Sequence, residues 1–229
     1  MSHLPTMLHS SCPDAPAILY FGTPVVLIGT RNPDGSANLA PFSSVFWLGW
    51  RAVIGLGTAS QTAANLERTG AAVLNLPSEE QVAAVDRLAL ATAADPVPRY
   101  KQTRGYRHVA DKFALAGLTE LAGEVTCAPR VAECPVQMEA ERVRCHGLAE
   151  GEAGLEGRLV VFELAVRRVH LAESILVPGE RGRVDPLRWR PLMMSFQRYF
   201  GLTAREVHPS RLARIPEHLY APSASRGGD

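Results

Sequence analysis

The sequence lacks any long apolar run, and no stretch approaches the roughly 18 consecutive apolar residues of a membrane helix. No basic region followed by an apolar one stands in residues 1–16, so no signal peptide is expected and the cytoplasm is the predicted location. The formal net charge is only +1, and no block of lysine and arginine stands out. The sequence therefore predicts neither a membrane nor a nucleic-acid partner.

Cysteine is scarce, and its spacing argues against a metal site. The four cysteines, Cys12, Cys127, Cys134 and Cys145, form no Cys-x-x-Cys pair, and no two histidines stand at metal-ligand spacing. In a reducing cytoplasm they are expected to be free thiols. A serine hydrolase is not supported either, because the chain has no Gly-x-Ser-x-Gly sequence.

What the chain does have is the size and composition of a single globular domain. It holds 229 residues, with 46% hydrophobic and 21% charged side chains. We expect an N-terminal arm over residues 1–16, a domain over 17–203 and a tail over 204–229. Within the domain, residues 92–115 combine prolines, a glycine, basic side chains and tyrosines, which predicts a loop or lid with a short helix over 108–115.

Short apolar, β-branched runs predict strands, and they outnumber the helices. A Ser60 start and a Gly70 end bound one helix, and a second begins at residue 77 with acids in its first turn. The strands are separated by short turns, which favours an antiparallel barrel or sandwich with a few covering helices. The strands are predicted over 24–30, 37–40, 51–56, 71–76, 131–146 and 158–171, and the second helix over 77–91.

A glycine pattern at the end of the third strand imitates a dinucleotide-binding fingerprint. Gly55 and Gly57 follow a strand and precede a helix. However, Ser60 stands where the third glycine or alanine belongs, the helix is short, and no βαβ units follow. A Rossmann fold is therefore not expected.

Two segments concentrate polar groups beside strand ends. In residues 38–44, Pro41 cannot extend a central ladder, so the strand should bend or end there and expose backbone groups that a planar, amide-bearing ring could pair with. In residues 58–65, three hydroxyls and amide side chains gather at a helix start, where free N–H groups attract anions. An ordinary helix cap remains the simpler interpretation of the second segment.

Groups that could act on a substrate are few. Lys101, Arg104, Arg107 and Lys112 cluster in the lid, where they are either solvated or able to receive a phosphate or an anionic substrate. His146 and His170 stand near strand ends, where a structural histidine is the more common case. Among these groups, Lys112 and His146 are taken as the candidate substrate-binding residues.

Taken in order, several motifs resemble the flavin reductase-like family of the FMN-binding split barrel. The resemblance covers residues 23–202, and the order and spacing of the motifs carry it more than any single one. The matching segments are Pro24-Val-Val-Leu-Ile-Gly-Thr, Asn38-Leu-Ala-Pro-Phe-Ser43, Thr58-Ala-Ser-Gln-Thr-Ala-Ala-Asn65, Val73-Leu-Asn75-Leu76, Lys112-Phe113, Gly117-Leu-Thr119 and Ala132-Glu-Cys-Pro135.

This resemblance implies a mainly β protein, a six-stranded antiparallel split barrel of Greek-key type. It further implies a homodimer with FMN at or near the subunit interface. FAD is the alternative flavin, and NAD(P)H a co-substrate. By the same resemblance, the isoalloxazine and ribityl chain would lie along Asn38, Ala40, Pro41, Phe42, Ser43 and Ser44, with Asn75 near the ring. The phosphate would be held by Thr58, Ser60, Gln61, Thr62 and Asn65.

The chain departs from the family pattern at two places. Short-chain flavin reductases often carry a Gly-Asp-His segment before a late strand, and here the matching Glu156-Gly157-Arg158 has no histidine. The late Arg-Leu-Gly-Gly…Tyr segment of many relatives is replaced by residues 192–201. The expected function is hydride transfer through flavin N5, with reduced flavin passed to a partner monooxygenase. Two alternatives stay open: an FMN-dependent reductase or oxidase of a small organic substrate, and a non-catalytic flavin- or haem-binding barrel.

Overall fold

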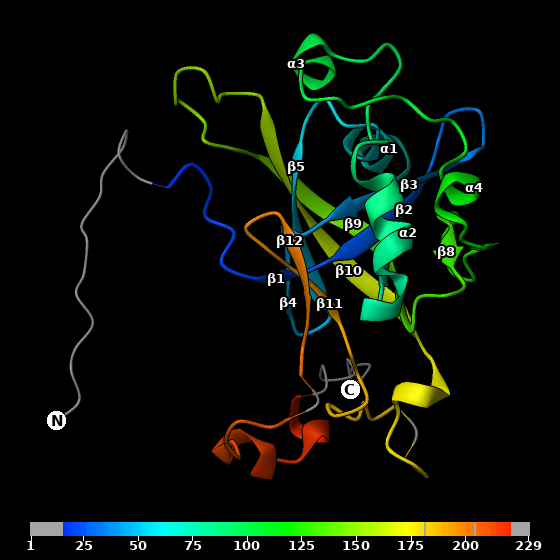
Figure 1. Ribbon diagram of the computed structural model, residues 1–229, viewed down its shortest axis with the longest axis vertical. Helices are drawn as coiled ribbons and strands as arrows, with labels where there is room; N and C mark the ends of the chain where they lie inside the picture. The colour runs from blue at the N-terminus through cyan, green and yellow to red at the C-terminus, as the bar shows by residue number, and fades with distance from the viewer. Residues whose placement is uncertain (1–15, 181, 204, 221–229) are drawn as a thin grey trace, which may run out of the picture.

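The computed structural model describes residues 16–180, 182–203 and 205–220 (Figure 1). Its main sheet has seven strands in the order β3-β2-β6-β9-β10-β5-β4, and every pairing among them is antiparallel. These strands are β2 (Val26–Arg31), β3 (Ala37–Phe42), β4 (Val45–Leu48), β5 (Arg51–Gly57), β6 (Ala71–Leu76), β9 (Val136–Leu148) and β10 (Leu159–Leu171).

The two edge strands of this order, β3 and β4, are consecutive in the chain. Only Ser43 and Ser44 separate them, so the sheet has to curl until its two edges meet. The mainly β split-barrel class predicted from the sequence is confirmed. The strand count is wrong, because the main sheet has seven strands and not six. The four-residue strand β4 is the one missing from the sequence prediction.

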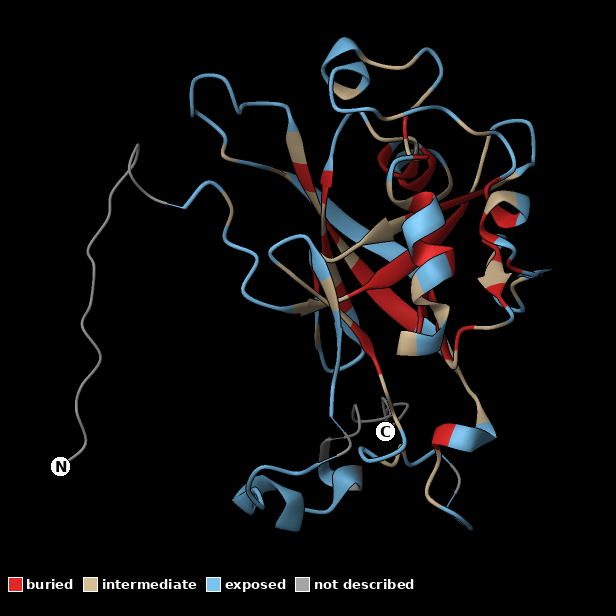
Figure 2. Ribbon diagram, viewed as in Figure 1, coloured by how far each residue is buried: buried red, intermediate tan, exposed pale blue. Residues whose placement is uncertain are grey.

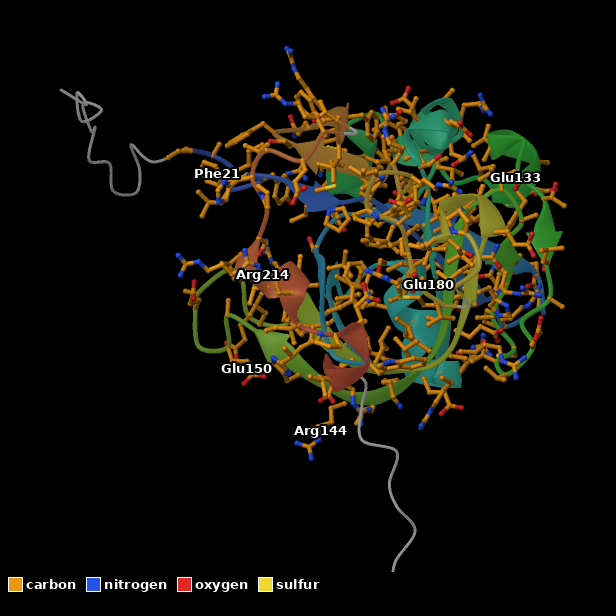
Figure 3. All side chains as sticks on the ribbon, turned by 90° about the horizontal axis from the view of Figure 1, so that it is seen from below. Phe21, Glu133, Arg144, Glu150, Glu180 and Arg214 are labelled. Atoms are coloured by element: carbon orange, nitrogen blue, oxygen red, sulfur yellow. The ribbon has the colours of Figure 1, made fainter. Side chains whose placement is uncertain are left out.

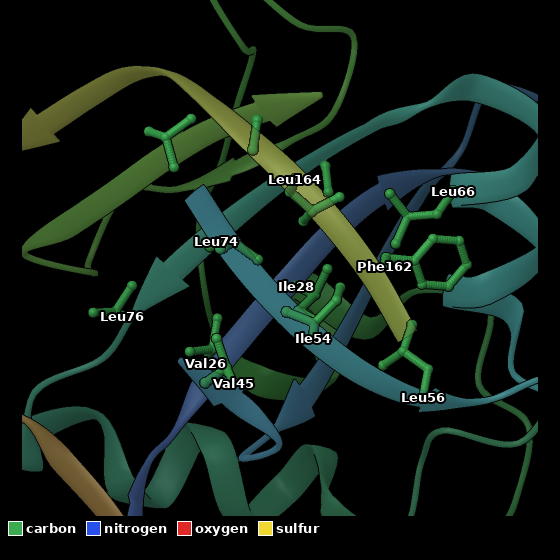
Figure 4. Close-up of a cluster of buried hydrophobic side chains, with 14 of the residues drawn as sticks. Val26, Ile28, Val45, Ile54, Leu56, Leu66, Leu74, Leu76, Phe162 and Leu164 are labelled. Atoms are coloured by element: carbon green, nitrogen blue, oxygen red, sulfur yellow. The ribbon is translucent and has the colours of Figure 1, made fainter. Parts of the chain in front are cut away.

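Strand β2 is buried on both of its faces, which explains its unbroken apolar sequence. Val26 and Ile28 point into the barrel interior, where they join side chains of β5, β6, β9 and β10 (Figure 4). Val25 and Leu27 belong to a second core on the other face, packed against helices. The burial colouring shows the buried residues along the strands of the barrel and on parts of helices α1 (Gln61–Thr69) and α2 (Val82–Ala89) (Figure 2).

The predicted helices are present, with small changes in their bounds. Helix α1 (Gln61–Thr69) begins at Ser60, whose side chain accepts from the Ala63 N–H, and ends at Gly70 with φ of 68°. The second predicted helix splits into a 3₁₀ turn, η1 (Glu79–Gln81), and helix α2 (Val82–Ala89). Helices α2 and α4 (Lys112–Ala116) cover β2 and β3. The lid holds one turn of helix, α3 (Arg99–Gln102), which the sequence does not predict.

Two smaller sheets and a C-terminal segment complete the described chain. Strand β1 (Thr23–Pro24) pairs with β11 (Leu192–Ser195), and β11 pairs with β12 (Arg198–Gly201). Strands β7 (Glu120–Leu121) and β8 (Arg130–Val131) form a short hairpin. The remaining 3₁₀ turns are η2 (Glu173–Ile175), η3 (Arg211–Arg214) and η4 (Glu217–Tyr220). The predicted arm lies outside the described residues except for Pro16, and the division into arm, domain and tail stays a prediction.

Strand β3 continues past Pro41 to Phe42 and does not end at the proline. Of the two outcomes predicted from the sequence, an end at the proline is therefore wrong, and the position of the strand explains why. Strand β3 is an edge strand, so one of its sides is unpaired. The position of the absent Pro41 N–H can face that side without removing a hydrogen bond from the sheet. The antiparallel pairings of β5 and β6 likewise agree with the exclusion of a Rossmann fold.

A buried carboxylate holds the loop that precedes β8. Glu139, on β9, is fully buried and accepts from the backbone N–H groups of Glu124, Val125 and Thr126 at 2.8–3.0 Å and from His170 at 2.7 Å. Burial alone would raise the pKa of Glu139, but these hydrogen bonds outweigh it and lower the pKa to about 2. The Glu139 carboxylate is therefore ionised and fixes this loop against the barrel.

The described cysteines are free thiols. Cys127 and Cys145 are exposed free thiols, and Cys134 is a buried one whose pKa is raised by burial. Cys12 lies outside the described residues, and the cytoplasmic location stays a prediction. In residues 16–180, 182–203 and 205–220, no three His, Cys, Asp or Glu side chains gather as metal ligands. No helix of this part of the chain is long and apolar enough to cross a membrane.

Candidate functional site

Three neighbouring cavities lie in a row along β3. The first, of about 250 Å³, shares Pro41 and Phe42 with the second, which measures about 580 Å³. On its other side it shares Asn38, Gln61 and Lys112 with the third, of about 370 Å³. The second and third cavities have no residue in common. The order along the strand is therefore third, first, second, and an elongated ligand could occupy more than one of them.

The first cavity is cationic. Its lining includes Lys101, Arg104 and Lys112 and no carboxylate. None of these three cations forms a salt bridge within the described residues, although eight arginines elsewhere do. A site with three cations and no carboxylate in its lining is suited to an anionic group.

The start of α1 supplies neutral donors to the same cavity. The Ser60, Gln61 and Thr62 side chains are in its lining. Ser60 caps the helix by accepting from the Ala63 N–H at 3.2 Å. No hydrogen bond of the described chain uses the backbone N–H groups of Gln61 and Thr62. These two N–H groups sit at the positive end of the helix dipole, so the cavity has both the charge and the donors that bind phosphate.

A buried polar network fixes the wall between the first and third cavities. Asn38, on β3, donates to Thr30 Oγ1 at 3.0 Å and to Thr62 Oγ1 at 3.2 Å. Its Oδ1 accepts from the Lys112 ammonium. Because all of these side chains are buried, each depends on the others for its hydrogen bonds. The network holds the Lys112 ammonium at the cavity wall.

Lys112 is the most unusual charged group of the site, because only 5% of its surface is exposed and its one hydrogen-bond partner is the neutral Asn38. Its place is set by α4, whose Phe113 packs in the helix-side core. Burial, and then the charge of Lys101, lower the pKa of Lys112 to about 8. An anion bound in the first cavity would favour the charged form of Lys112 and so raise its pKa against both of these effects.

The lid closes over this cavity from α3. Lys101 donates to the Thr92 carbonyl at 2.9 Å, and its ammonium lies 5.4 Å from the centre of the Tyr106 ring. Burial lowers the pKa of Lys101. Figure 1 shows α3 above α1 in this view, in agreement with the residues that both elements give to the cavity lining.

The second cavity is larger than the first, and its lining mixes aromatic and aliphatic side chains. Ser43 and Ser44 line it together with the end of β3, and the β11–β12 hairpin closes its other side. The hairpin turn holds Phe196 and Gln197 at positive φ, 43° and 63°, where residues other than glycine are rarely found. Phe196 meets the Phe21 ring edge-on at a centroid distance of 5.0 Å. The rest of the lining includes four aromatic side chains, Tyr20, Phe42, Tyr106 and Tyr199, beside aliphatic ones such as Ile18, Val85 and Leu90.

Four predicted site residues lie outside the three cavities. Thr58 donates to the Gly157 carbonyl at 2.8 Å and ties the start of α1 to the β9–β10 loop. Asn65 is buried and donates to Thr30 and Asn32. Asn75 is buried between the Leu27 carbonyl and the Val131 N–H. The side chains of these three residues are thus engaged within the protein.

His146 is also remote from the cavities. It is exposed on the outer half of β9, where it pairs with Val161 of β10. The labelled Arg144 and Glu150 belong to the same projecting end, and their side chains point away from the body of the molecule (Figure 3). The other predicted residues do come together: Asn38, Ala40, Pro41, Phe42, Ser60, Gln61, Thr62 and Lys112 in the first cavity, and Pro41, Phe42, Ser43 and Ser44 in the second.

Several lining residues are absent from the sequence-based set. Tyr100, Tyr106 and Thr92 belong to the lid, whose mix of basic and aromatic residues was a usable signal. Asp86 and Tyr199 reach the second cavity from α2 and β12, and only the folded chain brings them there. Burial, and then the charge of Asp86, raise the pKa of Tyr199, so this hydroxyl stays protonated at neutral pH.

Comparison with known proteins identifies the fold and the family. A family model described as flavin reductase like domain matches residues 18–203. Protein YdfE of Bacillus subtilis (strain 168), described as uncharacterized, is 34% identical over 192 residues, which cover 84% of this chain and 89% of that protein. The chain is also similar to two solved structures.

The first is nitrilotriacetate monooxygenase component B from Bacillus cereus, with a TM-score of 0.70 and 20% identity over 89% of this chain and 100% of that one. The second is flavoredoxin of Desulfovibrio vulgaris (Miyazaki F), with a TM-score of 0.68 and 22% identity over 90% of this chain and 99% of that one. At these identities the two structures establish likeness of fold alone.

Proposed function

Since this chain belongs to the flavin reductase like family, we propose that it is an oxidoreductase that binds FMN and passes hydride between a nicotinamide and the flavin. One observation carries the proposal. The first cavity combines three cations, no carboxylate and the free N–H groups of Gln61 and Thr62. Such a site matches the phosphate of FMN, which carries about two negative charges at neutral pH.

The remaining parts of FMN fit the same row of cavities. With its phosphate beside Ser60, Thr62 and Lys112, the ribityl chain would follow β3 towards Pro41. The flavin ring would then reach the second cavity at Ser43 and Ser44. Exposed backbone groups at the end of an edge strand are suited to the polar edge of the ring.

In this proposal the cofactor supplies the hydride-accepting atom, flavin N5. The protein binds the phosphate, orients the ring along β3 and excludes water with the lid. Hydride transfer to the ring requires no protein acid or base. The ionisable side chains in the described lining of the second cavity are those of Asp86, Arg104 and three tyrosines. The segment Glu156-Gly157-Arg158, which lacks the family histidine, does not line the second cavity. Its Gly157 carbonyl instead accepts a hydrogen bond from the Thr58 hydroxyl.

We further propose that the chain acts as a homodimer and that reduced flavin serves a partner monooxygenase. The similarity to a monooxygenase component supports such a partner. Exposed apolar side chains on β4 and the following turn support the dimer, because Phe46, Leu48 and Trp50 are 57%, 78% and 45% exposed.

A second candidate function is reduction or oxidation of a small organic molecule by FMN that stays bound. The volume and largely apolar lining residues of the second cavity favour it, since about 580 Å³ falls within the usual range for small-molecule sites. A carrier or sensor barrel that binds flavin or haem without turnover is the remaining alternative.

The absorbance spectrum of the purified protein, followed by anaerobic mixing with NADH or NADPH, tests these functions. We expect a bound yellow flavin whose absorbance bleaches faster than that of free FMN in buffer. A haem spectrum would contradict the flavin proposal. Bound flavin that neither nicotinamide bleaches faster than free FMN would contradict the reductase and favour the carrier. Bleaching that is reversed by a small organic oxidant, with the flavin still bound, would favour the second candidate.

A further inference from the structure

The tip of the β11–β12 hairpin is strained at the point where it reaches the second cavity. Ser195 pairs with Arg198, so Phe196 and Gln197 are the two central residues of the turn. Both have positive φ, a conformation for which such turns normally use asparagine and glycine. Other side chains are unfavourable there, and strain of this kind clusters at functional sites. The turn therefore calls for a functional explanation.

Contacts from the segment that precedes β1 hold the turn in this conformation. The Tyr20 carbonyl accepts from the Phe196 N–H at 2.9 Å and from the Ser195 hydroxyl at 3.3 Å. The Phe196 ring packs edge-on against Phe21 and lines none of the three cavities. Phe196 thus anchors the turn from outside, and Gln197 is the turn residue that lines the second cavity.

Gln197 brings a chemistry that the rest of the second cavity lacks. It is the only amide side chain in the described lining, and no hydrogen bond of the described chain uses that amide. An amide offers a donor and an acceptor side by side, so its matched neutral partner is another amide. At about 580 Å³ the cavity has room for a second ring between the flavin, placed at Ser43 and Ser44, and the hairpin.

From these observations we propose that the strained turn holds Gln197 as a specificity-determining residue, which recognises the carboxamide of the nicotinamide that exchanges hydride with the flavin. This inference rests on the proposed function and adds a residue and a selection rule to it. The carboxamide N–H₂ would donate to Gln197 Oε1, and the carboxamide oxygen would accept from Gln197 Nε2. The hairpin lies in residues 192–201, where the sequence departs from the family pattern, so this role is specific to this chain.

A nicotinamide analogue tests the recognition directly. The full-length, FMN-loaded protein is mixed anaerobically with NADH or NADPH, whichever bleaches the flavin faster, and with the reduced 3-acetylpyridine analogue of that nucleotide. The analogue has a methyl group in place of the carboxamide NH₂, so it keeps the acceptor and loses the donors. Each bleaching rate is divided by the rate with free FMN in buffer, which removes the difference in intrinsic reactivity.

On this scale the wild-type protein should prefer the carboxamide by roughly tenfold or more, because the analogue leaves Gln197 Oε1 without a donor. Gln197→Leu keeps the length of the side chain and the strain of the turn but removes the amide. We expect it to lose most of this preference, leaving a ratio within about twofold of that for free FMN. Its affinity for FMN and its melting temperature should stay unchanged.

The strain gives a second readout that does not depend on turnover. Gln197→Gly relieves the turn and removes the amide, so the melting temperature should rise by about 2–4 °C while the preference is lost. Ala149, with φ of 60° in the β9–β10 loop and outside the three cavities, provides the matched control. Ala149→Gly should raise the melting temperature similarly and leave the preference at its wild-type value.

A preference that survives Gln197→Leu, or a Gln197→Gly protein that melts no higher than the wild type, would overturn the inference and leave the proposed function standing. A wild-type protein whose flavin neither nucleotide bleaches faster than free FMN would contradict the proposed function and the inference with it.

Discussion

The Lys112 ammonium donates to the Oδ1 of Asn38 across the buried face of β3, and no carboxylate of the described chain pairs with it. A cation that is desolvated without a counter-ion costs free energy in the ligand-free protein. The first cavity is thus prepared for an anion before one arrives, and the first two predictions below depend on this state.

Replacement of Lys112 by Met should weaken FMN binding by roughly 10- to 100-fold, the value of one charge-assisted hydrogen bond. Riboflavin, which has no phosphate, should bind with unchanged affinity. Arg107→Met, in the same lid but outside the cavity linings, is the control. Fluorescence titration measures each affinity, and an equal loss for both flavins would contradict the phosphate assignment.

The affinity for FMN should fall as the pH rises above 8. The pKa of Lys112 is lowered to about 8, so the ligand-free protein loses this charge above that pH. Bound phosphate raises the pKa, and the affinity should therefore drop by up to tenfold per pH unit until the pKa of the complex is reached. Titrations between pH 7 and 9.5 should show this slope for FMN, a shallower one for FMN with Lys112→Met, because Lys101 remains, and none for riboflavin.

Ser60 and Ser78 both cap the start of a helix, so a comparison of their alanine variants distinguishes the loss of a cap from the loss of ligand binding. Ser60 caps α1, and Ser78 accepts from Glu80 N–H at the start of η1, outside all three cavities. Alanine at either position should cost about 1 kcal/mol of unfolding free energy. Only Ser60→Ala, alone or combined with Thr62→Ala, should also weaken FMN, by roughly tenfold or more. Urea unfolding and FMN titration of both variants check this difference, and equal FMN affinities would refute it.

Glu139→Gln should destabilise the protein near neutral pH and matter less in acid. The folded-state pKa of Glu139 is about 2 against an ordinary 4.5, so its contribution is fully present above pH 4.5 and is lost as the pH falls towards 2. The difference in pKa corresponds to about 3 kcal/mol. Urea unfolding of wild type and variant at pH 7 and pH 3 measures it. Glu141→Gln, which breaks an exposed pair with Arg167, should change stability by less than about 0.5 kcal/mol.

Leu48→Glu should weaken the proposed dimer. Leu48 is 78% exposed beside Phe46, and burial of a carboxylate in an apolar interface is unfavourable. Sedimentation velocity should show at least a tenfold rise in the dimer dissociation constant. Leu187→Glu, at a 54% exposed leucine away from β4, should leave it unchanged. A monomeric wild-type protein, or a Leu48→Glu dimer of full strength, would contradict the assignment.

The parts of the fold that the sequence predicts are those with local signals. Helix α1 has a capping serine and a terminal glycine, and both occupy the expected positions. The β11–β12 hairpin was missed because its turn is formed by Phe196 and Gln197 at positive φ, without the glycine or asparagine that normally marks such a turn. Strand β4 was missed because it is short and partly exposed.

The site divides in the same way. Ser60, Gln61 and Thr62 stand next to each other in the chain, and a local pattern was enough to predict them. The burial of Lys112 was not predictable, because it depends on how α4 docks on β3. Asn75 lies in a motif of the family resemblance, but its amide is engaged by backbone groups from β2 and β8 that are distant in sequence.

The two-residue connection of Ser43 and Ser44 joins the edges of the main sheet and also lines the second cavity. The length of this connection should consequently set both the circumference of the barrel and the width of the cavity opening. An inserted residue at this connection would loosen the closure and widen the mouth together. Diversification of ligand choice in this chain should therefore proceed through substitutions at these serines, while changes in length accumulate in the projecting β9–β10 loop.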